Sequence, residues 1–303
     1  MTDPLDSPSN HELIKEKIAI IQNSISKNED PSKYQLNFSF HGIEISFHTE
    51  SYQLWKNLKS YLPKNWLLSF KPKNKIFHHN VPASIKSIFD NEVSSLIKNI
   101  EKDSLTFSTQ RDFTACLTQE HICHVMFEDM IDDGLHNFFR WYLSPKLIKY
   151  NKCMIHSSVV IDENSYAQVF LGPSGAGKTT ITQLSRPKRV LSDDMNLFIL
   201  DDNKVYARPG GVGGFYKPDV ELDQKFTVKN IFWLKQSHQN YREEIPLITQ
   251  HRHFLSSLAN IPWKSLTSDK AEDYLRFCQK IVQITPLQNL YFSKDPDFFK
   301  NLS

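Results

Sequence analysis

Alternation of apolar and polar residues predicts a pair of strands near the start of the chain. In residues 34–40, written YQLNFSF, an apolar side chain returns at every second position, and residues 43–47, IEISF, repeat the pattern. A strand with one buried face has this period of two. The turn-forming pair His41-Gly42 separates the two runs, so we expect a β-hairpin.

Other segments carry the longer period of a helix. Apolar residues gather on one side of a helix in residues 11–25, 51–62, 127–143 and 269–282. Pro145 follows the third of these segments and is expected to close it. A short helix is also expected after Thr180.

From residue 153 onward the pattern changes to short apolar runs separated by polar turns. Residues 155–161 and 168–171 are predicted as strands, with a turn at 162–164 between them. Asp201-Asp202-Asn203 is interpreted as a hairpin turn. Further short strands are expected at residues 66–70, 105–107, 189–191, 197–200, 204–208 and 230–234.

The order of these elements predicts three parts. Residues 1–33 form a polar tail followed by a helix, and residues 34–126 form a small α+β domain. Residues 127–303 follow the strand–loop–helix–strand order of an α/β domain.

Composition narrows the class of protein. With 40% hydrophobic and 12% aromatic residues, the 303-residue chain can build a core. Lys and Arg number 36 against 34 Asp and Glu, a balance that argues against nucleic acid or an anionic membrane as the main partner. The polar start lacks the features of a signal peptide, no apolar run approaches the length of a membrane span, and the four cysteines are scattered. We therefore expect a cytoplasmic protein.

Glycine is rare and concentrated. Seven of the nine glycines lie between residues 172 and 214. The first group belongs to the sequence GPSGAGKT, which follows an apolar run and matches the phosphate-binding pattern G-x-x-x-x-G-K-[ST]. The residues expected to bind the cofactor are Gly172, Pro173, Ser174, Gly175, Ala176, Gly177, Lys178, Thr179 and Thr180.

Each residue type in this motif has a chemical reason. Glycines let successive backbone N–H groups turn toward phosphate oxygens. Lys178 supplies a positive charge to the outer phosphates, and the Thr179 hydroxyl can bind Mg²⁺. The pair Asp193-Asp194 follows the next short apolar run, where such proteins place a carboxylate on the metal. One aspartate could bind the metal while the other accepts a proton, although the pair could also simply begin a turn.

Two more features are candidates. His156 opens the predicted strand that precedes the strand leading into the phosphate-binding loop, and a lone histidine there is either structural or catalytic. The second glycine group forms either a mobile substrate loop or a flexible hairpin tip. This candidate substrate loop comprises Arg208, Gly210, Gly211, Gly213 and Gly214, with Lys217 close behind. The pairs His78-His79 and His121/His124 have no partner at zinc-site spacing.

The window from His156 to Asp194 resembles the catalytic domain of HPr serine kinase/phosphorylase and related proteins. The resemblance rests on Ile155-His156, on GPSGAGKT and on Ser192-Asp193-Asp194. It implies a P-loop kinase core with a mixed sheet, shared with phosphoenolpyruvate carboxykinase, and a possible homo-oligomer. It also implies a kinase that uses ATP and Mg²⁺ on a serine hydroxyl, with Thr179 and Asp194 on the metal.

In this resemblance Asp193 is the base, with His156 and Lys178 beside it as catalytic residues. The family's signature segment after the acidic strand is replaced by the glycine group, so the hydroxyl acceptor, whether protein, peptide or small molecule, stays open. Two other functions also stay open: an ATP-binding regulatory or interaction module, and an ATPase without an acceptor. If Asp193, Asp194 or His156 points away from the outer phosphate, the regulatory or interaction module becomes the favoured function.

Overall fold

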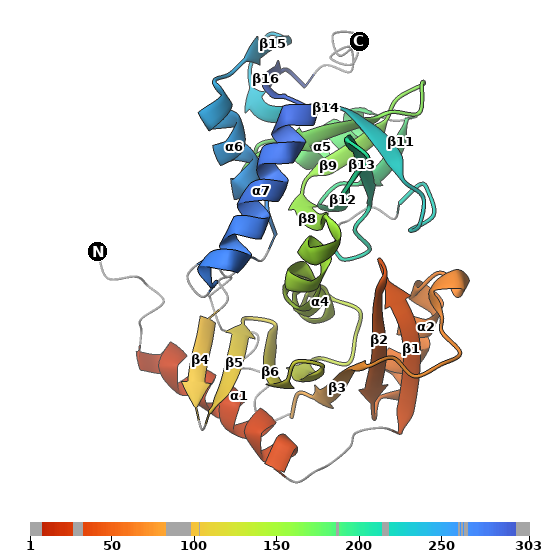
Figure 1. Ribbon diagram of the computed structural model, residues 1–303, viewed down its shortest axis with the longest axis vertical. Coiled ribbons are helices and arrows are strands. Elements are labelled where there is room, and N and C mark those ends of the chain that lie inside the picture. Colours follow the sequence, from red (N-terminus) through yellow and green to blue (C-terminus); the bar gives the residue numbers. More distant parts are fainter. Residues whose placement is uncertain are drawn as a thin grey trace. The chain divides into compact units, whose positions relative to one another are not determined.

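In the computed structural model the chain is a mixed α/β protein with two mixed sheets (Figure 1). The structure describes residues 8–26, 33–82, 98–102, 104–185, 188–213, 218–259, 261, 263 and 266–294. The chain divides into two compact units, Met1–Trp141 and Tyr142–Ser303. The division falls inside helix α4 (Asp133–Leu147), whereas we expected a boundary between residues 126 and 127.

The first unit is built on a seven-stranded sheet with the order β1-β2-β3-β7-β6-β5-β4. Its strands are β1 (Tyr34–Phe40), β2 (Ile43–Thr49), β3 (Asn74–Asn80), β4 (Lys98–Lys102), β5 (Leu105–Gln110), β6 (Phe113–Gln119) and β7 (Ile122–Phe127). The predicted hairpin is confirmed, since β1 pairs antiparallel with β2 around His41-Gly42. The neighbours of β3 run parallel to it, which makes the sheet mixed.

Helices cover the sheet of the first unit by means of their apolar sides. On α1 (Pro8–Ser26), Ile14, Ile18 and Ile21 pack with Phe107 and Met126 of the sheet. The rings of α4 contact the phenylalanines of β1, because the Phe139 ring lies 5.2 Å from that of Phe40. Helix α2 (Tyr52–Tyr61) begins at Ser51, whose hydroxyl accepts a hydrogen bond from the Leu54 N–H. The first two helix predictions are therefore confirmed.

Two predictions in this unit are wrong in part. Phe127 does not begin a helix, because it pairs with Asn80 at the end of β7. Helix α4 starts at Asp133, and Pro145 lies inside its last turns instead of closing it. The strand expected over residues 66–70 is replaced by a short 3₁₀ helix, η2 (Lys64–Trp66), followed by a single bridge at Leu67.

The second unit holds a nine-stranded sheet whose main order is β11-β9-β10-β14-β13-β12-β8. Its strands are β8 (Lys152–His156), β9 (Ser158–Ile161), β10 (Ala167–Leu171), β11 (Arg189–Ser192), β12 (Met195–Asp201), β13 (Lys204–Pro209), β14 (Phe226–Gln236), β15 (Tyr241–Glu244) and β16 (Leu287–Phe292). The expected turn at residues 201–203 joins β12 to β13, with Asp202 and Asn203 at positive φ.

The nine-stranded sheet bends where Ser157 connects β8 to β9. The prediction of a single strand over residues 155–161 is wrong, because Ser157 separates β8 from β9. β8 pairs with β12 at one end of the strand order, and β9 lies near the other end. A one-residue connection between them requires the two ends of the sheet to approach each other. Ser157 holds this bend, since its N–H donates to the Asp194 carbonyl at 2.9 Å and its carbonyl accepts from Asn196 Nδ2 at 2.7 Å.

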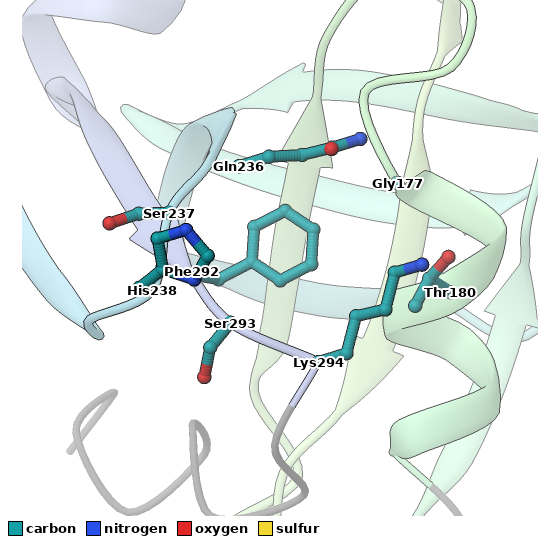
Figure 2. Close-up of a pocket in the computed structure, with 8 residues that line it drawn as sticks. All are labelled: Gly177, Thr180, Gln236, Ser237, His238, Phe292, Ser293 and Lys294. Atoms are coloured by element: carbon teal, nitrogen blue, oxygen red, sulfur yellow. The ribbon is translucent and has the colours of Figure 1, made fainter.

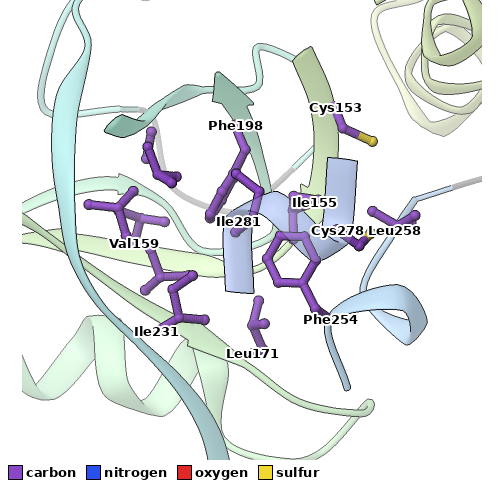
Figure 3. Packing of buried hydrophobic residues seen from close by; sticks show 14 of the residues in the cluster. Cys153, Ile155, Val159, Leu171, Phe198, Ile231, Phe254, Leu258, Cys278 and Ile281 are labelled. Atoms are coloured by element: carbon purple, nitrogen blue, oxygen red, sulfur yellow. The ribbon is translucent and has the colours of Figure 1, made fainter. Parts of the chain in front are cut away.

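The main core of the second unit lies between this sheet and two helices (Figure 3). Helix α7 (Ser268–Ile284) contributes Phe277, Cys278 and Ile281, and its predicted position is confirmed. Helix α6 (Leu247–Ser256) contributes Phe254, whose ring lies 5.9 Å from that of Phe198. The sequence analysis did not predict α6, β15 or β16. No helix among the described residues is both long and apolar enough to span a bilayer.

Acid is expected to destabilise the protein through His78, which is buried in the first unit. Its Nε2 lies 3.0 Å from the Phe127 carbonyl and its Nδ1 lies 3.0 Å from the Thr49 hydroxyl, so the neutral ring satisfies both partners. Burial lowers the pKa of His78 from 6.5 to about 4. Between these values the unfolded chain binds the proton more tightly, so stability is complete above pH 6.5 and falls as the pH drops toward 4.

For His78 alone the loss between pH 7 and pH 5 is about 2 kcal/mol. Urea unfolding of the wild type and of His78→Gln at both pH values measures it, and the variant is expected to lose less stability on acidification. His121→Gln, in the turn between β6 and β7, is the control. An equal pH dependence in wild type and His78→Gln would contradict this assignment.

Candidate phosphate-binding site

The GPSGAGKT loop connects β10 to helix α5 (Lys178–Leu184), which is the strand–loop–helix context that the motif requires. Two of its glycines have a left-handed backbone, with φ of 77° at Gly175 and 108° at Gly177. β10 lies inside the sheet between β9 and β14, so the loop begins from a fixed point. The loop therefore has both the sequence and the setting of a phosphate cradle.

Lys178 lies at the base of this loop and is 7% exposed. Its Nζ donates hydrogen bonds to the carbonyls of Gly172 at 2.8 Å and Pro173 at 3.2 Å. Burial lowers the pKa of Lys178, and the negative charge of Asp194 acts in the opposite direction. The ammonium group is thus bound to the loop carbonyls and lies within the electrostatic influence of Asp194.

Asp194 contacts His156, with 3.0 Å between Oδ1 and Nε2. The sheet brings them together, since His156 is the last residue of β8 and pairs with Met195, which begins β12. The side chains of His156 and Asp194 are 43% and 29% exposed. The sequence analysis placed His156 at the opening of a strand, and the structure places it at the end of one. Three predicted site residues, Lys178, Asp194 and His156, are therefore neighbours.

Asp193 differs from Asp194 in burial. Asp193 is 2% exposed, whereas the Asp194 side chain reaches solvent. The Ser192 hydroxyl accepts the N–H groups of Asp194 at 3.3 Å and Met195 at 3.2 Å, which fixes the turn that separates the two aspartates. Adjacent residues in such a turn point in different directions, so only Asp194 is accessible to a ligand beside Lys178. The role of Asp193 as the base stays a prediction.

The second glycine group starts next to this turn. Gly210 donates its N–H to the Met195 carbonyl at 3.0 Å, and a Cβ on Gly210 would lie 2.7 Å from that oxygen. Gly211 and Gly213 have positive φ. The segment is therefore packed beside the Asp193-Asp194 turn as far as Val212, which is 1% exposed.

The candidate substrate loop also includes Arg208, Gly214 and Lys217. Arg208 belongs to β13, where burial lowers the pKa of its guanidinium and the charge of Asp223 acts in the opposite direction. Gly214 and Lys217 lie outside the described residues. Whether the loop binds a substrate stays a prediction.

The predicted metal ligands are one hydroxyl and one carboxylate, which is the number expected for a metal ion that enters the site together with phosphate. Within the described ranges no group of three or more His, Cys, Asp and Glu side chains could hold a metal ion. Mg²⁺ in phosphate-transfer sites usually takes one or two protein oxygens and fills its remaining positions with phosphate and water. Thr179 and Asp194, the two predicted ligands, are partly exposed, and their role in holding Mg²⁺ stays a prediction.

Two residues that the sequence analysis missed support the loop from β14 and β16. Gln236 Nε2 donates to the Gly175 carbonyl at 2.9 Å, and the Phe292 ring packs on Gly177. Neither residue lies in a motif, and they follow the loop by about 60 and 115 positions along the chain. No signal in the sequence could have linked them to it.

No model of a known protein family matches this chain, and no curated protein matches it in sequence. The function is therefore argued from the geometry of the site.

Gly177 offers a test of the loop conformation. A Cβ at this position would collide with the Phe292 ring, and φ of 108° is strained for any L side chain. Gly177→Ala is expected to cost about 1–3 kcal/mol of stability and to weaken phosphate binding. Gly175→Ala is the matched control, since φ is also positive there but no atom lies within 4 Å of the added methyl. Thermal unfolding and calorimetric titration of both variants measure the difference; an equal effect would contradict the role of Phe292.

Proposed function

We propose that this protein is an ATP- and Mg²⁺-dependent kinase that transfers the γ-phosphate to a hydroxyl group of a protein, peptide or small molecule. One observation carries the proposal: Asp194 lies close to two other site residues. Its Oδ1 is 3.0 Å from Nε2 of His156, and its negative charge raises the pKa of Lys178, the lysine of the GPSGAGKT loop, against the larger effect of burial. A phosphate cradle, a cation and an accessible carboxylate are the parts that such a transfer needs.

In the proposed reaction the acceptor oxygen attacks the γ-phosphorus, the bond from that phosphorus to the β–γ bridging oxygen breaks, and ADP leaves. The hydroxyl proton passes to the Asp194 carboxylate, which His156 orients through the 3.0 Å contact between Nε2 and Oδ1. Lys178 exchanges the carbonyls of Gly172 and Pro173 for phosphate oxygens and offsets their charge. Mg²⁺ entering with ATP would be held by Thr179 and would neutralise the β- and γ-phosphates.

This assignment modifies the sequence-based hypothesis. The resemblance gave Asp193 the role of base and Asp194 that of metal ligand. Because Asp193 is 2% exposed, the accessible Asp194 is better placed to meet an acceptor. Asp193 would then support the turn that positions Asp194.

The first experiment is calorimetric titration with Mg·ATP, Mg·GTP and pyrophosphate, followed by incubation with γ-labelled ATP and a panel of serine peptides and small hydroxyl compounds. Saturable Mg·ATP binding and label in an acceptor are expected. Binding of none of the three ligands would contradict the proposal.

A second function has one observation in its favour. Asp193, one member of the predicted catalytic set, is 2% exposed, and a buried carboxylate that takes no part in transfer is expected for a nucleotide-binding regulatory module. In that case Mg·ATP binds, no acceptor takes up label, and hydrolysis stays at background. An ATPase would instead release phosphate at a rate that no added hydroxyl compound changes.

A further inference from the structure

Helix α2 of the first unit belongs to a strongly cationic stretch of the chain. Residues 51–80 contain six lysines and neither aspartate nor glutamate. The whole chain is almost balanced, with 36 Lys and Arg against 34 Asp and Glu, so its overall composition conceals this local charge. A surface with such an excess of one sign attracts a partner of the opposite sign.

Aromatic rings lie beside the lysines on the outer side of α2. Two rings and two lysines follow one another at the spacing of a single helix face: Tyr52, Trp55, Lys56 and Lys59. The Tyr34 ring of β1 lies 5.4 Å from that of Tyr52 and 6.0 Å from that of Trp55, in agreement with the place of α2 beside β1 (Figure 1). The Trp55 indole N–H donates to the Gln35 carbonyl at 3.0 Å and fixes the aromatic group on the sheet.

Three lysines border these rings. Nζ of Lys33 lies 5.7 Å from the centre of the Tyr34 ring, and Nζ of Lys59 lies 4.9 Å from that of Trp55. Lys56 is exposed on the same side of the helix. Among the residues that the structure describes, none of these three lysines forms an ion pair with an aspartate or a glutamate. The α2 surface is made of these six residues: Lys33, Tyr34, Tyr52, Trp55, Lys56 and Lys59.

The shape of the α2 surface suits a polypeptide. Small molecules bind in cavities, such as the pocket of about 450 Å³ beside the phosphate-binding loop of the second unit (Figure 2). The outer side of a helix is convex instead, and Tyr52 is 52% exposed there. With 10 residues, α2 is about 15 Å long, a length that about five residues of an extended peptide span.

The positions of the lysines favour carboxylates over nucleic-acid bases. The ammonium groups of Lys33 and Lys59 lie over the faces of aromatic rings, so a base would have to displace them before it could stack. A carboxylate can meet the same ammonium groups where they lie. We infer that the α2 surface docks an acidic segment of a polypeptide. The inference rests on the proposed function for the role of that polypeptide as the hydroxyl acceptor, and it selects a protein or peptide over a small molecule.

The experiment compares two peptides of equal length, each with a central serine flanked either by glutamates or by glutamines. Calorimetry on the full chain at low salt measures their affinities. Wild type is expected to bind the glutamate peptide at least about fivefold more tightly than the glutamine peptide, since three surface ion pairs form only with the former. At about 1 M NaCl, where charges are screened within about 3 Å, this preference should disappear.

Charge reversal locates the binding surface. Lys56→Glu/Lys59→Glu should remove the preference for the glutamate peptide, and Lys56→Gln/Lys59→Gln, which keeps good helix formers, should reduce it. Lys270→Glu/Lys280→Glu changes the net charge equally at two exposed positions of α7 in the second unit. This matched control should bind both peptides like wild type. Thermal unfolding of each variant shows whether the fold is retained.

The possible results separate the docking surface from the proposed kinase. Equal affinities of wild type for the two peptides, or a preference that both α2 variants retain, would overturn the inference and leave the phosphotransfer proposal standing. Tighter binding of single-stranded oligothymidylate or of phosphatidylserine vesicles, lost in Lys56→Glu/Lys59→Glu, would assign the surface to nucleic acid or membrane and overturn it as well. A preference that depends on α2, without transfer of label from ATP to the serine, would support the docking surface and count against the proposed kinase.

Discussion

Replacing Lys178 with alanine is expected to lower the affinity for Mg·ATP about 100-fold or more and to abolish phosphate transfer. The Lys178 ammonium is the only cation that the GPSGAGKT motif itself supplies. It is positioned by the carbonyls of Gly172 and Pro173 and is already near Asp194. Charge of this kind at the outer phosphates is a main source of transition-state stabilisation in phosphoryl transfer.

The fold should survive this replacement, because alanine is a good helix former at the first residue of α5 and removes a buried charge. Lys188→Ala, which removes the ion pair with Glu163 at 3.0 Å, is the matched control and should bind Mg·ATP like wild type. Calorimetry and thermal unfolding of the two variants separate loss of binding from loss of folding. Turnover retained in Lys178→Ala would contradict the assignment of the loop.

Asp194→Asn is expected to slow transfer about 10²- to 10⁴-fold while Mg·ATP binding weakens much less. The amide keeps the size of the carboxylate but carries no charge and cannot accept the hydroxyl proton. Single-turnover transfer from labelled ATP at saturating Mg²⁺ measures the effect. Asp202→Asn in the β12–β13 turn is the control, since asparagine suits the left-handed backbone at φ of 45°.

Asp193→Asn decides between the two aspartates. The resemblance to HPr kinase predicts that this change removes transfer and preserves Mg·ATP binding, with Asp194 on the metal. The burial of Asp193 predicts a change in stability first, since a group that is 2% exposed acts mainly on its surroundings. Transfer at the wild-type rate in Asp194→Asn, together with its loss in a stably folded Asp193→Asn, would show that the proton acceptor is Asp193.

The sequence predicted well where neighbouring residues decide the structure. The β1–β2 hairpin follows from alternation around His41-Gly42, and helix α7 follows from a strong helical period. The turn at Asp202-Asn203 follows from residues that tolerate positive φ. The GPSGAGKT loop could be recognised in the sequence because its glycines, lysine and threonine lie within eight consecutive residues. In each case the interactions that fix the structure lie within a few residues of one another.

Elements fixed by distant contacts were predicted poorly. The residues after Phe127 have the apolar spacing of a helix, but Phe127 itself belongs to a strand because β7 pairs with β3. Residues 155–161 contain no turn-forming glycine, proline, asparagine or aspartate, and the different partners of β8 and β9 explain the break at Ser157. Pairing across a sheet depends on residues far along the chain, and local propensity does not contain that information.

The candidate site divides in the same way. The sequence by itself determined where the GPSGAGKT loop lies and named His156, Asp193 and Asp194 as candidates. Only the tertiary structure decided that His156 meets Asp194, because the register of β8 against β12 sets that contact. It likewise decided that Asp193 is buried, and that Phe292 closes against Gly177 to form one wall of a pocket. A motif records which backbone can bind phosphate, whereas the surroundings of that phosphate are set by the packing of strands that are distant in sequence.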